Sequence, residues 1–137
     1  MDAKEELLRG FYAARARRDW AAVRAMLAED VAWHELGPEQ DYSGDHRGRE
    51  QVVALLEKLV DVTDGSFVLE PTDAIVTAEH VAASVRWHAE RGGRQVAGYD
   101  LAVFRVAADG KIAEAWFFPD GFDLDELSEV FSFASGA

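Results

Sequence analysis

The sequence predicts an α+β fold: a curved antiparallel sheet packed on three N-terminal helices, with an internal pocket and a short C-terminal helix. The main observation is that residues 81–122 contain three long, β-rich runs joined by the glycine turns ERGGR and AADGK, which is typical of an antiparallel meander. The expected strands at 81–90, 94–107 and 111–118 are long enough to curl, and a curled sheet closed by helices encloses a cavity. Most strands follow the helices, which is the order of an α+β domain.

Composition favours one soluble globular domain over residues 1–137, because 49% of the residues are hydrophobic and can form a core. A net charge of −12 opposes binding to nucleic acid, whose affinity depends on Lys and Arg. The chain has no cysteine, which excludes disulfides and thiolate chemistry. No apolar run is long enough for a membrane span, and the charged start MDAKEELLRG is unlike a signal peptide, so we expect a cytoplasmic protein.

The helices and strands follow from capping residues and periodicity. Asp2 begins an amphipathic helix over residues 3–18, and Asp19 begins a second, short helix. Alternation in VAWHEL makes residues 31–36 a strand. The next segment, GPEQDYSGDHRG, reads as a turn-rich loop. The buried face of the first helix is predicted to contain Leu7, Leu8, Phe11, Tyr12 and Ala14.

The remaining elements complete the layout. A third helix is expected over residues 49–62, and a strand over 66–77 contains Pro71, which indicates a bulge or a sheet edge. Asp123 with Glu126 begins the C-terminal helix at 124–132.

Three segments together carry a resemblance to a known family: FYAARARRDWAAVRAMLAEDVAWHELG, SGDHRGREQVVALL and FRVAADGKIAEAWFFPDG. Their order and spacing resemble the SnoaL-like members of the nuclear transport factor 2-like superfamily, the cone-shaped fold shared with ketosteroid isomerases. The resemblance implies that fold for nearly the whole chain. It does not fix the function, because this fold hosts cyclases, isomerases, hydrolases and binding modules.

The resemblance also implies positions for catalytic residues, and this chain departs from most of them. The cyclase His falls on Ala102 and the cyclase acid on Phe117, neither of which can move a proton. Of the ketosteroid isomerase set, the two oxyanion donors fall on Phe11 and Ala102, whereas the base falls on Glu35. The charged residues of an epoxide-hydrolase mechanism fall near Val85, Trp87 and Phe118.

Glu35, Asp100 and His34 are the candidate catalytic residues. Glu35 shares a strand face with two apolar residues, so burial would raise its pKa toward that of a general base; the alternative is a strand-end residue facing water. Asp100 alternates with Ala102 and can act beside Glu35, or it lies at the rim. His34 points to the opposite face unless a β-bulge reverses it, in which case it becomes a proton carrier.

The expected ligand is a flat or alicyclic apolar molecule with a few oxygens. Tyr12 lies one position from the lost oxyanion donor and either reaches the ligand or is a core tyrosine. No histidine pair has metal-ligand spacing, so no metal or other cofactor is predicted. The residues expected to contact the ligand are Tyr12, Trp33, Trp87, Ala102, Phe104 and Phe117.

On the outer sheet face, Tyr99, Leu101 and Val103 form an apolar row, which predicts a homodimer. Three functions remain open. The first is an enzyme that transfers a proton on an apolar, oxygenated, polyketide-type compound by isomerisation, cyclisation or epoxide opening. The second is a module that binds such a ligand without turnover. The third is a structural dimerisation domain whose cavity is filled.

Overall fold

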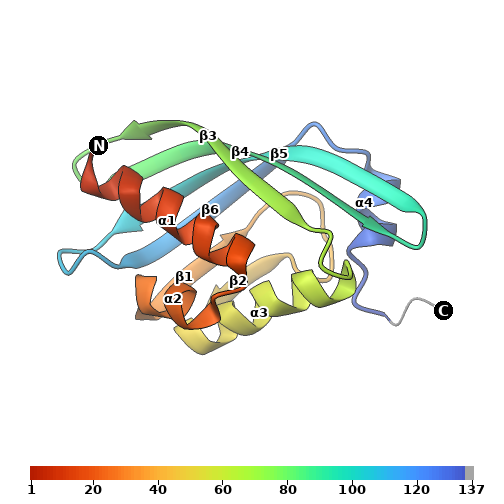
Figure 1. The fold of residues 1–137 in the computed structure, drawn as a ribbon, viewed down its shortest axis with the longest axis horizontal. Helices are drawn as coiled ribbons and strands as arrows, with labels where there is room; N and C mark the ends of the chain where they lie inside the picture. Colours follow the sequence, from red (N-terminus) through yellow and green to blue (C-terminus); the bar gives the residue numbers. More distant parts are fainter. Residues whose placement is uncertain (135–137) are drawn as a thin grey trace.

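The computed structural model describes residues 1–134, which form three helices, a six-stranded sheet and a final short helix (Figure 1). The predicted α+β class is confirmed. In chain order the elements are α1 (Ala3–Arg17), α2 (Trp20–Met26), β1 (Leu27–Glu35), β2 (Gly44–Arg47), α3 (Arg49–Val62), β3 (Val68–Val76), β4 (His80–Arg91), β5 (Arg94–Val106), β6 (Ile112–Asp120) and α4 (Leu124–Val130).

The sheet has the strand order β2-β1-β6-β5-β4-β3, and the predicted meander is its β4-β5-β6 half. One detail of the expected antiparallel sheet was wrong: β1 and β6 are parallel, with Trp33 beside Ala115. Because β1 and β6 are far apart in the chain, the long segment between them can bring β6 alongside β1 in the same direction. Pro71 lies on the edge strand β3, next to a register shift.

The strand β2 was missed, because GPEQDYSGDHRG was expected to be a loop throughout. Its last part, Gly44–Arg47, pairs with β1 at the other edge of the sheet. All four residues are glycine or polar, and none is buried. Such a strand carries no alternation of apolar and polar residues, and therefore no periodic signal in the sequence.

The starts of α1, α2 and α4 were predicted correctly from their aspartates. The Asp19 carboxylate accepts a hydrogen bond from the Ala22 backbone N–H at 3.1 Å, and Asp123 accepts one from Glu126 at 3.0 Å. These bonds satisfy N–H groups that have no partner inside a helix. In the described part of the chain, no helix has the length and apolarity needed to cross a membrane.

The core lies between the helices and the concave face of the bent sheet (Figure 1). At its centre, Phe11, Trp33, Phe104 and Phe117 pack ring to ring, the closest pair being Trp33 and Phe117 at 4.4 Å between centroids. Phe11, Trp33 and Phe104 are fully buried. Because this aromatic cluster fills the middle of the cone, the remaining space lies toward the end that α4 covers.

Candidate functional site

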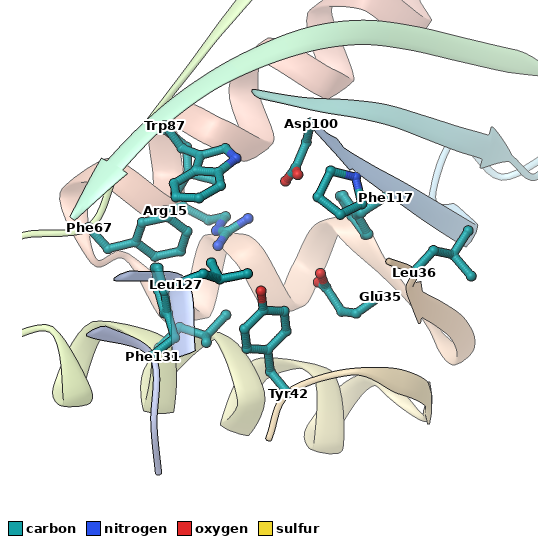
Figure 2. A pocket seen from close by; sticks show the side chains of 13 residues that line it. Arg15, Glu35, Leu36, Tyr42, Phe67, Trp87, Asp100, Phe117, Leu127 and Phe131 are labelled. Atoms are coloured by element: carbon teal, nitrogen blue, oxygen red, sulfur yellow. The ribbon is translucent and has the colours of Figure 1, made fainter. Parts of the chain in front are cut away.

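A cavity lies between the aromatic cluster and α4 (Figure 2). The space between its walls is about 500 Å³ when the open solvent at its mouth is included, and only about 40 Å³ of it admits the centre of a water-sized sphere. Its walls are mostly apolar, with two carboxylates, one guanidinium and one phenol among them. The lining residues are Arg15, Glu35, Leu36, Tyr42, Leu59, Phe67, Leu69, Trp87, Asp100, Phe117, Pro119, Leu127 and Phe131.

Glu35 is the last residue of β1 and directs its carboxylate into the cavity (Figure 2). The neighbouring inward side chain, Trp33, donates a hydrogen bond from Nε1 to Glu35 Oε2 at 2.7 Å. The carboxylate is surrounded by protein but keeps some accessibility through the cavity. Burial raises the pKa of Glu35, and the Trp33 hydrogen bond and the Arg15 charge only partly oppose that rise.

Asp100 faces the same cavity from β5. Burial and the negative charge of Glu35 raise the pKa of Asp100 to about 7, against the opposing effect of Arg15. The Trp87 indole N–H lies on the Asp100 side of the cavity (Figure 2) and favours the ionised carboxylate. It completes no hydrogen bond with any residue in 1–134. Near neutral pH, Asp100 can therefore both hold and release a proton.

Arg15 reaches the cavity from the last turn of α1, and the sequence analysis missed it. Only 6% of this residue is exposed. Its guanidinium lies 5.6 Å from the Tyr12 ring centroid and 6.0 Å from that of Phe67, within cation–π range. Burial lowers the pKa of Arg15. The signal was present, because position 15 continues the buried stripe of Leu8, Phe11 and Tyr12.

Tyr42 was missed as well. It lies in the connection between β1 and β2, and its side chain lines the cavity with Glu35. Burial, with the charges of Glu35 and Asp100, raises the pKa of Tyr42 well above its usual value. The phenol therefore stays protonated and can donate a hydrogen bond to a ligand oxygen. The aromatic wall around Phe67 and Phe131, whose ring centroids are 4.9 Å apart, comes from the start of the predicted strand 66–77 and the end of the predicted helix 124–132, and neither residue was predicted to line the cavity.

Of the six residues expected to contact a ligand, Trp87 and Phe117 line the cavity. The other four, Tyr12, Trp33, Ala102 and Phe104, lie behind its wall in the core. The reason is packing. The centroid of the Phe104 ring lies 5.5 Å from that of Phe11 and 6.2 Å from that of Tyr12, on which the ring stacks. This cluster occupies the space that the small Ala102 was expected to leave free.

His34 lies outside the cavity, on the convex face of the sheet. The register of β1 with β2 runs without interruption through residues 33–35, so the bulge that would turn His34 inward is absent there. Its Nδ1 lies 2.6 Å from Asp45 Oδ1 and its Nε2 2.7 Å from Glu114 Oε2. Because the two carboxylates bind opposite ring nitrogens, they do not converge on one point as metal ligands would.

Known protein families and structures resemble this chain. Residues 8–115 match the SnoaL-like domain family. The chain belongs to the SnoaL-like family. No curated protein sequence matches it.

Solved structures show how widely this SnoaL-like fold is shared. Bal32a, from a soil-derived mobile gene cassette, is 25% identical, with a TM-score of 0.85 over 94% of this chain and 96% of that one. A protein of unknown function with a cystatin-like fold from Xanthomonas campestris is 24% identical, with a TM-score of 0.83 over 96% and 99%. TerC, co-crystallised with polyporic acid, is 19% identical, with a TM-score of 0.78 over 95% and 98%.

Proposed function

We propose that this SnoaL-like protein is an enzyme that transfers a proton on an apolar, oxygenated small molecule, with Glu35 as the base. The observation that carries the proposal is that Glu35 and Asp100 face one aromatic-lined cavity in different environments. Glu35 accepts the Trp33 hydrogen bond and ionises first, and its charge then helps to keep Asp100 protonated up to about pH 7. Pairs of carboxyl groups with separated pKa values divide into a base and an acid.

The pair suits chemistry next to a carbonyl group. Glu35 would take a proton from the carbon beside the carbonyl, and Asp100 would give its proton to the oxygen on which negative charge develops. In an isomerisation, Glu35 returns its proton to a different carbon while Asp100 takes back the proton from the oxygen. In a cyclisation, the enol carbon attacks a second carbonyl, whose oxygen takes the proton held by Glu35 while Asp100 recovers its own. Epoxide opening would use the same acid on the epoxide oxygen and Glu35 to activate water.

The ligand class follows from the lining. Phe67, Trp87, Phe117 and Phe131 present rings to the cavity, which favours a flat or alicyclic compound, such as a polyketide-type intermediate. The complex of TerC with polyporic acid supports a ligand of this apolar, oxygenated kind.

A second candidate function is a module that binds such a compound without turnover. It is favoured by Ala102 and Phe117, which occupy the positions where the resemblance to cyclases expects a histidine and an acid. On that account the same cavity holds the ligand, and the two carboxylates contribute hydrogen bonds only.

The proposed assembly is a homodimer through the convex sheet face. Tyr99, Leu101 and Phe118 are 50%, 47% and 45% exposed there, and Leu101 pairs with Phe118 across β5 and β6. An apolar group of this kind is typical of an interface. Leu101→Lys is expected to convert a dimer to a monomer in sedimentation equilibrium, whereas a wild-type monomer would contradict this assembly.

The experiment that tests the catalytic proposal uses 5-nitrobenzisoxazole, which loses a carbon-bound proton as its N–O bond breaks and releases a coloured phenolate. Wild-type protein is expected to turn it over with an apparent pKa above about 4.3, the usual value for Glu. Glu35→Gln should lower kcat/KM by about 100-fold or more. The matched control, Glu29→Gln, changes an exposed glutamate of the same strand and should not affect the rate.

Two results would contradict the proposal that Glu35 is the catalytic base. If wild type and Glu35→Gln are equally inactive, the binding module becomes the better account. If both are equally active, the base lies elsewhere.

A further inference from the structure

We propose that Arg15 binds a carboxylate of the ligand, so that the protein acts on, or holds, an apolar monocarboxylic acid. This inference rests on the proposed use of the cavity as a ligand site, and it adds the chemical class that the site selects. Figure 2 shows the Arg15 guanidinium inside the cavity, beside Phe67, Trp87 and Leu127.

The first observation is that Arg15 is buried without an acceptor. It is 6% exposed, yet within residues 1–134 its guanidinium forms no hydrogen bond and no ion pair. A guanidinium carries five N–H donors and stays charged in proteins. A buried charge that lacks both a counter-ion and hydrogen bonds is costly to the fold. A bound anion would remove that cost.

Several other arginines in residues 1–134 find acceptors, although Arg49 Nε does not. Arg9 pairs with Glu5 at 2.9 Å and donates to the Thr72 carbonyl at 2.7 Å. Arg91 donates to the Ala134 carbonyl at 2.8 Å. Arg15 instead has ring faces on two sides, those of Tyr12 and Phe67. These rings position the guanidinium and restrict its rotation, but they leave its N–H edge free for a ligand.

The acids of the cavity compensate the charge of Arg15 only from a distance. Glu35 Oε2 accepts its hydrogen bond from Trp33, and Asp100 faces the cavity from β5. Neither forms an ion pair with the guanidinium, although both act on its pKa through space. The cavity thus has a cationic side on α1 and an acidic side on β1 and β5. A ligand of suitable length would place its carboxylate at Arg15 and its reactive carbon near Glu35.

A monocarboxylate fits this arrangement better than other anions. The planar guanidinium matches a carboxylate through two parallel hydrogen bonds. A phosphate would bring close to two negative charges into a cavity that already holds Glu35 and Asp100, and repulsion would weaken its binding. The aromatic walls supply the remaining affinity through the apolar part of the acid.

The test compares two probes of nearly equal shape, 2-naphthoate and 2-naphthamide, by isothermal titration calorimetry at pH 6 on the full chain. Wild type is expected to bind naphthoate at least 10-fold more tightly than naphthamide. Arg15→Met should remove that preference, whereas Arg15→Lys, which keeps the charge but not the planar fork, should retain part of it. The matched control, Arg17→Met, changes an exposed arginine of the same helix and should keep the full preference.

Equal wild-type affinity for the two probes, no naphthoate binding, or a preference that persists in Arg15→Met would each overturn the proposal. Circular dichroism checks that the variants are folded. The two proposals fail differently. If Arg15 is not an anion site, wild type can still turn over benzisoxazole through Glu35. If Glu35 is not a base, that turnover is lost while the naphthoate preference remains.

Discussion

His34 and Glu35 are adjacent on β1 and point to opposite faces of the sheet, and their surroundings differ sharply. On the convex face, His34 lies between Asp45 and Glu114, and Glu114 also reaches Arg105 at 3.4 Å. In the cavity, Glu35 has only the Trp33 N–H as a hydrogen-bond donor among residues 1–134. The convex charges are therefore paired with one another beside water, whereas the cavity charges are enclosed by apolar groups.

This difference in pairing distinguishes charges that stabilise the fold from charges that are available to bind a ligand. Paired surface groups stabilise a fold slightly and need no ligand. Buried groups without partners destabilise it, and natural proteins carry such groups mainly at functional sites. Arg15, Asp100 and the unpaired N–H of Trp87 lie around the same cavity, whereas the unpaired Arg49 Nε and Glu126 Oε2 lie outside its lining.

The largest expected effect is on stability at Asp100. Its pKa is raised from 3.8 to about 7, so the folded state holds a proton that the unfolded state releases between those values. Stability is therefore lost as pH rises from about 4 to 7. Asp100→Asn removes this loss and should stabilise the fold by up to about 4 kcal/mol at pH 8, with little effect at pH 4. Urea unfolding of wild type and Asp100→Asn at pH 4 and pH 8 measures this difference in stability.

The matched control is Asp73→Asn, which makes the same change at an exposed position of β3 and should have no comparable effect. Equal stability of wild type and Asp100→Asn at pH 8 would show that this carboxyl is not destabilised in the cavity.

A smaller effect of opposite sign is expected on the convex face. Glu114→Gln removes the negative charge that accepts from both His34 and Arg105. Because the side chain is one-quarter exposed, the loss should be only about 1 kcal/mol. Urea unfolding at pH 6 gives the value. A stabilised variant would mean that the charges on the convex face destabilise the fold, as those of the cavity do.

The smallest effect concerns the pH dependence of His34. Burial lowers the pKa of His34, but the hydrogen bonds to Asp45 and Glu114 outweigh burial and raise it. The stabilisation is therefore complete below about pH 6.5 and is lost as pH rises through the raised pKa. His34→Gln should lower the melting temperature more at pH 6 than at pH 9. An equal decrease at both pH values would indicate a neutral histidine.

Much of the fold was predictable, because long apolar strands and capping aspartates depend on local sequence. The orientation of Glu35 was also predictable, since alternation along β1 placed it with Val31 and Trp33, which are fully buried. The same reasoning placed Asp100 with Ala102 on the inward face of β5.

The cavity was less predictable, because its volume depends on packing between distant segments. Tyr12 and Phe104 were expected to contact the ligand, but they fill the core with Phe11. Tyr42 approaches from a loop without periodicity, and Phe131 lies at the end of the predicted C-terminal helix, whose packing against the cavity the local sequence does not give. Arg15 was missed because a charged residue was assumed to leave the buried stripe of α1.

The most direct test of the account is a ¹³C NMR titration of the Glu35 and Asp100 carboxyl groups. The account predicts that Asp100 titrates near pH 7 and that Glu35→Gln lowers its pKa, because the neighbouring negative charge is gone. An Asp100 carboxyl that titrates near 3.8, its ordinary value, in both proteins would contradict the claim that the cavity holds two coupled, unpaired carboxyl groups.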